Sequence, residues 1–202
     1  AESTGPTQAA AMRWQGCFYM RLGQYEAART ALTAALPLAD APELEASILA
    51  DLATVETGTG DYEAALVHYT LALRLLPAHS DARLQLLCGL GSLQGRLGRL
   101  AEARNTLEEA ARLARQYTDP AMLAIASGSL GLLLIQQKET LAAEAALQEA
   151  LNAARQAEAL WLTAHLLGHL GVLAQDRNDL EKAAEHYQSA RDLTQSIGDQ
   201  RG

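Results

Sequence analysis

The sequence contains few cysteines and no long hydrophobic segment. Its two cysteines, Cys17 and Cys88, lie far apart and form no C-x-x-C pair. This argues against a disulfide framework and favours a reducing compartment. No apolar run approaches the roughly 18 residues needed to span a bilayer, and the opening "AESTGPTQAA" lacks the basic and apolar regions of a signal peptide. We therefore expect a soluble, cytoplasmic chain with no membrane contact.

Positive charge is also scarce. Sixteen Lys and Arg residues stand against 24 Asp and Glu residues, which gives a net charge of −8. The basic residues are scattered and form no basic face of the kind that binds nucleic acid. We therefore expect no nucleic-acid partner, and the acidity itself indicates only solubility.

Aromatic residues make up only 4% of the chain, and β-branched residues are sparse, which argues against a β-sheet. Hydrophobic residues nevertheless reach 49%. Most of them are Ala and Leu, which have high helix propensities. The composition therefore predicts an all-α protein.

One pattern occurs five times along the chain. Apolar helical patterns flank five equivalent points that are separated by 37, 38, 40 and 40 residues: Gly23, Gly60, Gly98, Lys138 and Asn178. Gly or Asn at such a point can adopt the left-handed conformation that ends a helix at little cost, and Lys138 fits this explanation least well. A period of this length is typical of a solenoid whose repeats each consist of a helix, a tight turn and a second helix.

Small and large apolar residues recur at fixed distances from these turns. Small residues follow each turn after 5 and after 12 positions, with a larger apolar residue between them. The first small residues are Ala28, Ala65, Ala103, Ala143 and Ala183, the second are Ala35, Ala72, Ala110, Ala150 and Ala190, and the large ones are Leu32, Tyr69, Leu107, Leu147 and Tyr187. The preceding helices carry Gly16, Ala53, Gly91, Gly131 and Gly171. Because a glycine inside a helix costs about 1 kcal/mol relative to alanine, its recurrence predicts close contact between helices.

With these features the chain resembles the tetratricopeptide repeat family. The resemblance rests on "LG" at Leu130–Gly131 and Leu170–Gly171, on "GDYEAA" (Gly60–Ala65), on the alanine pairs and on Pro77, and it covers about residues 9–197. The family's standard unit has 34 residues. The longer period here is similar to that of kinesin light chains and of the sensor regions of bacterial signalling ATPases and transcription activators.

The resemblance implies a right-handed α-solenoid of about five repeats, at about residues 9–45, 46–83, 84–123, 124–163 and 164–197. Residues 1–8 are predicted to be a flexible lead-in, and residues 198–202 a tail that follows a helix-stopping Gly198. Ser80 or Asp81 is a candidate helix N-cap, as is Asp119 before Pro120. Between Ala154 and Leu162 no Gly or Pro marks the helix end.

No pattern of catalytic residues is evident. The segment "GLGSLQG" (Gly89–Gly95) lacks the preceding strand of a phosphate-binding loop and is expected inside a helix. His165 and His169 have a spacing that can hold a metal ion, but no third ligand accompanies them. No cysteine or serine stands with a histidine and an acid as a nucleophile requires. We predict no enzyme activity, no cofactor and no metal site.

The remaining candidate site is the concave face that the first helices of a solenoid line. The packing pattern leaves these positions facing inward: Arg13, Trp14, Cys17, Arg21, Asp51, Thr54, Gly89, Ser92, Arg96, Ser129, Leu132, Gln136, His165, His169, Val172 and Asp176. Trp14 and the arginines are candidate anchors for a partner. The positions of the family's carboxylate clamp hold Arg13, Cys17, Ser47, Ala50 and Asp51, which do not reproduce it. Ser129 and His169 replace the asparagine that often precedes "LG".

We predict a non-enzymatic scaffold that binds a protein or peptide and is a fragment of a larger regulatory protein. The alternative is a sensor module that binds a small inducer or signalling peptide and relays this to an attached ATPase or transcription-regulator domain. The last helix has no following neighbour in the sequence. Either the chain continues in a longer protein, or this helix forms a homodimer with a second copy.

Overall fold

The structure is a computed structural model that describes residues 5–77 and 80–199. Within these ranges it contains ten α-helices, one short 3₁₀ helix and no strand, which confirms the all-α class. The helices are α1 (Gly5–Arg21), α2 (Tyr25–Ala35), η1 (Leu36–Leu38), α3 (Pro42–Thr59), α4 (Tyr62–Leu75), α5 (Asp81–Arg96), α6 (Leu100–Tyr117), α7 (Pro120–Gln136), α8 (Thr140–Gln156), α9 (Leu160–Asp176) and α10 (Leu180–Asp199). None of the helices so described is both long and apolar enough to cross a bilayer.

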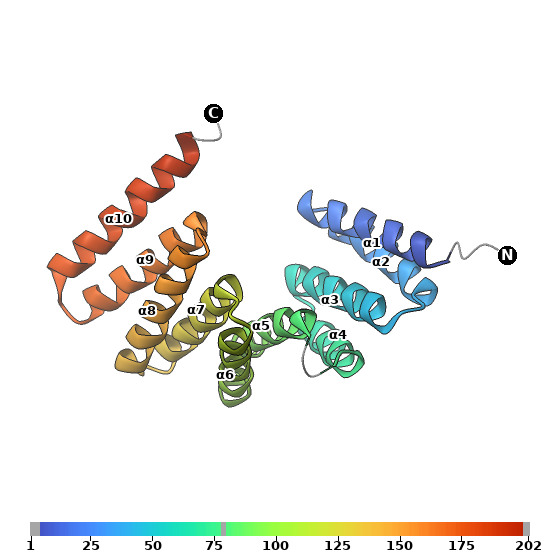
Figure 1. The fold of residues 1–202 in the computed structure, drawn as a ribbon, viewed down its shortest axis with the longest axis horizontal. Helices are drawn as coiled ribbons and strands as arrows, with labels where there is room; N and C mark the ends of the chain where they lie inside the picture. Colours follow the sequence, from blue (N-terminus) through green and yellow to red (C-terminus); the bar gives the residue numbers. More distant parts are fainter. Residues whose placement is uncertain (1–4, 78–79, 200–202) are drawn as a thin grey trace. The chain divides into compact units, whose positions relative to one another are not determined.

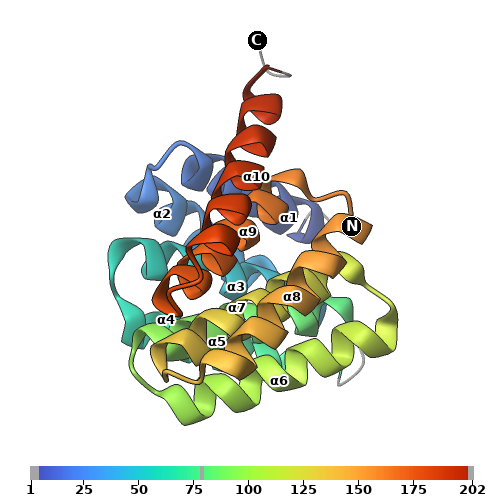
Figure 2. The ribbon, with the colours of Figure 1, turned by 90° about the vertical axis from the view of Figure 1, so that its left-hand side faces the viewer.

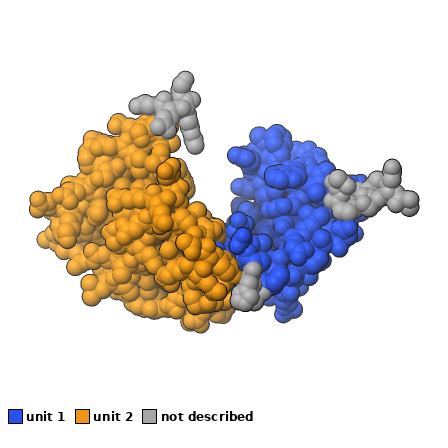
Figure 3. Space-filling model, viewed as in Figure 1, with its two compact units in different colours: residues 1–98 blue, residues 99–202 orange. Residues whose placement is uncertain are grey.

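The chain forms two compact units, Ala1–Gly98 and Arg99–Gly202 (Figure 3). In the first unit α1 packs with α2 and α3 with α4, and each helix pair contacts the helix that follows it (Figure 1). In the second unit α7 packs with α8 and α9 with α10, and α6 contacts α7 as α8 contacts α9. Figure 2 shows α10 running beside α9. We call the odd-numbered helices the first helices and the even-numbered ones the second helices.

The turns within the repeats lie where the sequence predicts them. The five equivalent points have positive φ angles: 71° at Gly23, 87° at Gly60, 75° at Gly98 and 61° at both Lys138 and Asn178. Lys138, the least favourable of the five by residue type, therefore adopts the same left-handed conformation. Its turn is closed by two backbone hydrogen bonds of 2.9 Å, which offset the cost of about 1–2 kcal/mol that this conformation has for a residue with a Cβ atom.

The helix end that the sequence left open, between α8 and α9, uses the same conformation. Glu158 has a φ of 53°, and Thr118 has a φ of 56° in the corresponding turn between α6 and α7. The predicted caps are also present. The Ser80 hydroxyl accepts a hydrogen bond from the Arg83 amide at 3.2 Å, and the Asp119 carboxylate accepts one from the Met122 amide at 3.0 Å.

The two ends differ in part from the sequence prediction. Helix α1 already includes residues 5–8 of the expected lead-in, and residues 1–4 lie outside the described residues. The prediction that Gly198 stops a helix is wrong, because α10 runs through it to Asp199 and Gly198 has no positive φ. Glycine permits a left-handed turn without requiring one. Residues 200–202 of the predicted tail lie outside the described residues.

Close contact between small and large residues holds each hairpin together. The Leu32, Leu107 and Leu147 side chains are at most 1% exposed. A Cβ atom added to Gly16 would lie 2.6 Å from the Leu32 side chain, and one added to Gly131 would lie 2.7 Å from Leu147. Such distances exclude any larger residue without a shift of the neighbour, which confirms the close contact predicted from the recurring glycines.

One buried polar pair links α3 to α4. The Glu56 side chain is only 8% exposed, and its carboxylate lies 2.7 Å from Nδ1 of His68. The corresponding positions in the fourth repeat hold Leu134 and Ala146. The same place in the fold is therefore compatible with a polar pair or with an apolar pair.

We expect His68→Ala to lower the free energy of unfolding by about 1–3 kcal/mol, because it leaves the buried Glu56 carboxylate without its partner. The double variant Glu56→Leu/His68→Ala reproduces the apolar pair of the fourth repeat and should recover most of that loss. Urea unfolding followed by circular dichroism measures both effects. A double variant less stable than His68→Ala would show that the polar pair is not what matters at this position.

Candidate functional site

The fifteen residues predicted to line the binding face, together with Gly89, lie on the first helices. Their side chains are exposed or partly exposed in every case. Helix α1 carries Arg13, Trp14, Cys17 and Arg21; α3 carries Asp51 and Thr54; α5 carries Ser92 and Arg96; α7 carries Ser129, Leu132 and Gln136; and α9 carries His165, His169, Val172 and Asp176. Their location is thus compatible with binding, while their role as ligand contacts stays a prediction.

Three of these residues form a cluster between α1 and α3. The Arg13 Nε atom lies 2.6 Å from Oδ2 of Asp51, and the two side chains are 31% and 17% exposed. The Cys17 thiol donates to the same oxygen at 3.3 Å. Burial raises the pKa of the Cys17 thiol to about 11, and the negative charge of Asp51 and this hydrogen bond add to the shift. The thiol is therefore protonated at neutral pH and serves as a hydrogen-bond donor.

A cavity of about 190 Å³ opens beside this cluster in the first unit. Its polar lining consists of Arg13, Ser47, Asp51, Thr54, Tyr69 and Gln85, and alanines and leucines of the same unit complete it. The sequence predicted Arg13, Asp51 and Thr54 for this face but missed Gln85, and it assigned Tyr69 to packing alone. Only the residue type could have indicated this role for Tyr69. A tyrosine stands where three of the five repeats have leucine, and its hydroxyl is a polar group at the end of a packed ring.

The Tyr69 hydroxyl reaches the cavity because Gly89 leaves room for it. A Cβ atom on Gly89 would lie 2.7 Å from that hydroxyl oxygen. Burial raises the pKa of Tyr69, and a hydrogen bond with Thr54 partly opposes the shift. As expected from the sequence, Gly89 to Gly95 lie inside a helix, and Gly89 serves side-chain packing there.

Arg96 contacts a different part of the first unit. Its guanidinium donates to the Tyr62 hydroxyl at 2.6 Å and lies 4.9 Å from the centre of the Tyr62 ring. Tyr62 is in the first turn of α4, and Arg96 is in the last turn of α5. Arg96 is therefore held by a neighbouring repeat and does not line the cavity beside Asp51.

The second unit has a cavity of about 430 Å³ on α9 and α10. Its lining includes the predicted residues His165, His169 and Val172, together with Tyr187 and Thr194. Burial lowers the pKa of His169, and the neighbouring His165 lowers it further. Both effects favour a neutral imidazole.

An exposed tryptophan beside this cavity was missed. The Trp161 ring is centred 4.0 Å from that of His165, and its side chain is 64% exposed. Trp161 precedes His165 by one helical turn, so their shared helix face was visible in the sequence. Across residues 5–77 and 80–199 no group of three or more His, Cys, Asp or Glu side chains is placed to hold a metal ion.

The two cavities occupy equivalent positions of the repeat. Shifting the numbering by 118 residues carries Ser47, Asp51, Thr54 and Tyr69 onto four residues that line the second cavity: His165, His169, Val172 and Tyr187. The same place in the hairpin is thus hollow in both units but lined by different chemical groups. The first cavity presents an ion pair and hydroxyls, and the second presents imidazoles and an apolar side chain.

Two tetratricopeptide repeat family models match the sequence, over residues 45–116 and 11–41, and together they cover about half of the chain. No curated protein matches it. BtubC (BKLC) from P. vanneervenii has a similar structure, with a TM-score of 0.76 and 16% identity over 98% of this chain and 93% of that chain. MamA (41-end) from Desulfovibrio magneticus RS-1 has a TM-score of 0.69 and 21% identity over 94% of this chain and 96% of that chain.

A further similar structure is that of a Rap protein complexed with Competence and Sporulation Factor. Its TM-score is 0.81 at 17% identity, over 96% of this chain and 57% of that chain. This chain thus spans little more than half of the Rap chain. At such identities the shared feature is the fold, an α-solenoid of helix-turn-helix repeats. The two family-model matches, the repeat period of the sequence and the observed fold all indicate the same family. The chain belongs to the tetratricopeptide repeat family.

Proposed function

We propose that the chain is a non-enzymatic scaffold that binds a protein or peptide partner on the cavity-bearing face of its first helices. The observation that supports this most directly is the pair of cavities at equivalent repeat positions, each lined in part by exposed or partly exposed side chains of the first helices. A ligand site of this kind combines an apolar surface with a few fixed polar groups.

The lining of each cavity indicates what a partner would present. In the first unit the Arg13–Asp51 pair supplies a fixed donor and a fixed acceptor beside apolar side chains, which suits a peptide backbone or a polar side chain. In the second unit the His165 and His169 rings and Val172 suit an apolar or aromatic side chain. The Rap protein that shares this fold was solved in complex with Competence and Sporulation Factor, which supports a binding role for the fold.

The test is a selection of random-sequence peptides on the purified protein, followed by affinity measurement on two matched variants. Thr54→Arg places a long side chain in the cavity of the first unit. Thr30→Arg is the control, because Thr30 is also an exposed helical threonine whose hydroxyl donates to the carbonyl four residues earlier, at the same 2.9 Å. Thr30 is on second helix α2, away from the proposed face.

We expect selected peptides to bind Thr54→Arg at least tenfold more weakly than the wild type and to bind Thr30→Arg equally well. Arginine has a higher helix propensity than threonine, so both helices should stay formed, and thermal unfolding measures the cost of losing the Thr54 hydrogen bond with Tyr69. Val172→Arg is the corresponding variant in the second unit. If the selected peptides bind both Thr54→Arg and Val172→Arg as tightly as the wild type, this face is not the binding surface.

We also propose the biological setting that the sequence predicts. It includes the larger regulatory protein, the alternative of a sensor module for a small inducer or signalling peptide, and a homodimer through α10. A thermal shift with a small molecule that Thr54→Arg or Val172→Arg abolishes would support the sensor. A concentration-dependent dimer in light scattering would support pairing through α10.

A further inference from the structure

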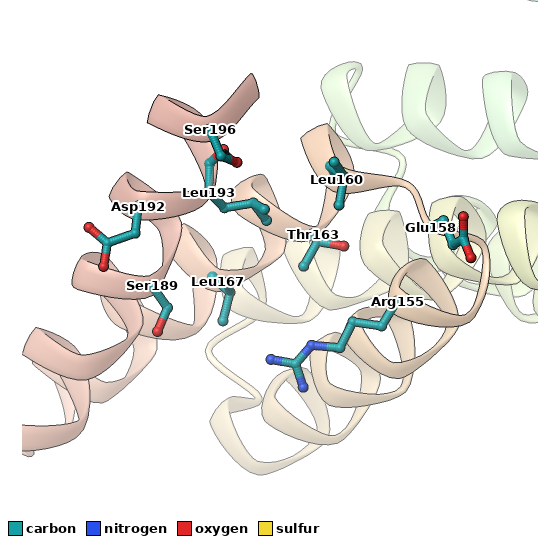
Figure 4. A pocket seen from close by; sticks show the side chains of 9 residues that line it. All are labelled: Arg155, Glu158, Leu160, Thr163, Leu167, Ser189, Asp192, Leu193 and Ser196. Carbon is teal, nitrogen blue, oxygen red and sulfur yellow. Dashed lines mark hydrogen bonds between the residues drawn. The ribbon is translucent and has the colours of Figure 1, made fainter. Parts of the chain in front are cut away.

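A separate cavity of about 660 Å³ lies in the second unit and shares no lining residue with the two cavities described above. It is formed by the last turn of α8, the turn that follows, the first half of α9 and the second half of α10 (Figure 4). Arg155 contributes its one positive charge, and Leu160, Leu167 and Leu193 contribute its apolar surface.

The junction between the third and fourth repeats shows one way in which this position is filled. Forty residues earlier, Arg115 corresponds to Arg155. Its guanidinium holds the Glu149 carboxylate through two hydrogen bonds of 2.8 Å, and the Ser127 hydroxyl donates to the same carboxylate at 2.8 Å. The bonds from Arg115 lower the pKa of Glu149. The arginine at this repeat position is thus arranged to bind a carboxylate.

Between the fourth and fifth repeats the arginine is retained and its partners are lost. Ser189 stands at the position of Glu149, and Leu167 stands at that of Ser127. In the part of the chain that the structure describes, no acidic side chain lies within ion-pairing distance of Arg155. The shorter Ser189 also leaves space: the corresponding cavity beside Arg115 measures about 200 Å³, against about 660 Å³ here.

Two acidic residues also line this cavity but do not neutralise Arg155. The Asp192 carboxylate accepts a hydrogen bond of 2.6 Å from Gln188 and lies 3.9 Å from Nε of Arg191. In Figure 4 the Arg155 guanidinium points towards α10, and the Glu158 carboxylate lies on the other side of Arg155. These acids weaken the binding of any anion, and they weaken that of a multiply charged ligand most, so the cavity suits a single carboxylate placed next to an apolar group.

We propose that this cavity is a second peptide-binding site, which receives a glutamate or aspartate side chain of a partner at Arg155 and an adjacent apolar side chain over Leu160, Leu167 and Leu193. The partner's carboxylate takes the place that the Glu149 carboxylate occupies beside Arg115. An exposed ion pair alone binds weakly, so the apolar contact supplies much of the affinity and the arginine selects the acidic residue. The site is distinct from the first-helix cavities and does not depend on them.

The experiment uses the full chain and a peptide library with blocked ends, in which a central Glu-Leu pair is fixed and the flanking residues vary. A matched library carries Gln-Leu. Binding is followed by NMR, through the Arg155 side-chain NεH signal and the methyl signals of Leu167 and Leu193. We expect Glu-Leu peptides to shift these signals and to bind at least fivefold more tightly than their Gln-Leu counterparts.

Two variants test the role of the arginine. Arg155→Met should reduce the affinity for Glu-Leu peptides about fivefold without changing thermal stability, because the side chain is exposed and has no internal partner. Arg112→Met is the matched control, since Arg112 is an exposed arginine of α6 whose guanidinium donates a hydrogen bond of 3.4 Å to Gln116. Thr54→Arg should leave this binding unchanged, which separates it from the first-helix face.

A third variant restores the internal partner. Ser189→Glu recreates the pair of Arg115 and Glu149 and leaves the apolar lining intact, so the protein's own carboxylate should occupy Arg155 and reduce peptide binding at least tenfold. Equal binding of Glu-Leu and Gln-Leu peptides would overturn the proposal, as would full binding by the Ser189→Glu variant. So would shifts confined to His165 and its neighbours, or a dimer of the free protein that Arg155→Met abolishes.

Discussion

Replacing Leu147 by alanine is expected to lower the free energy of unfolding by about 2–5 kcal/mol, the range observed when a large side chain is removed from a closed core. The Leu147 side chain is fully buried and belongs to the core of the second unit together with Ala143, Ala150 and Leu151. It also fills the space beside Gly131, whose missing side chain allows the close approach of α7 and α8. The small side chains beside Leu147 cannot easily close the cavity that alanine would leave.

At Gly131, which faces Leu147, a larger side chain rather than a smaller one should lower the stability. A Cβ atom on Gly131 would lie 2.7 Å from both Cγ and Cδ2 of Leu147, and Cγ is a branch point that cannot swing away freely. Gly131→Ala should therefore destabilise the wild type, because overpacking costs about 1–3 kcal/mol and exceeds the gain in helix propensity of about 1 kcal/mol. In the Leu147→Ala background the clash is gone, so the same substitution should stabilise.

Gly168→Ala is the matched control. Gly168 also lies inside a first helix, but no atom is within 4 Å of the position its Cβ would take. This substitution should stabilise by about 0.5–1 kcal/mol through helix propensity alone. Midpoints of urea unfolding measure all four variants in the same way. Strict additivity of Gly131→Ala and Leu147→Ala would show that the two residues do not share a contact.

The hairpins and their turns could be predicted from the sequence because the repeat fixes them locally. A residue that must adopt a positive φ recurs at the same distance from the same alanines, so even Lys138 was placed correctly. The helix end at Glu158 could not be located in this way, because neither its residue type nor its neighbours signal a turn. Five backbone positions of similar geometry, rather than five glycines, are what the repeat conserves within this chain.

The sequence predicted which helix face carries the candidate site residues, but it did not predict which of these residues lie together. Arg13, Asp51 and Thr54 line one cavity as their positions suggested, but Arg96 bonds to Tyr62 instead. Which partner a long side chain reaches depends on distances between helices, and these are not contained in the periodicity of one helix. The same reason hid Arg155: its missing partner is visible only once Arg115 and Glu149 are known to meet across two helices.

The second large effect is expected at Cys17. Because its pKa is about 11 rather than 9.0, the reactive thiolate should be about 100 times less abundant at pH 8 than for an unperturbed thiol. Reaction with a thiol reagent such as dithiobisnitrobenzoate should be slower by about that factor than in the same protein unfolded by urea. A Cys88→Ala background isolates the Cys17 signal, although Cys88 is itself buried.

The pH profile separates a raised pKa from simple steric protection. Steric protection lowers the rate at every pH, whereas a raised pKa moves the rise of the rate from near pH 9 towards pH 11. Asp51→Asn should speed the reaction at pH 8, since it removes the charge and the hydrogen bond that assist burial in raising the pKa of Cys17. A rise centred near pH 9 would contradict the account. If it holds, the thiol acts in this face as a donor that fixes Asp51 against Arg13, and Cys17→Ser, which keeps a donor, should leave peptide binding intact where Cys17→Ala weakens it.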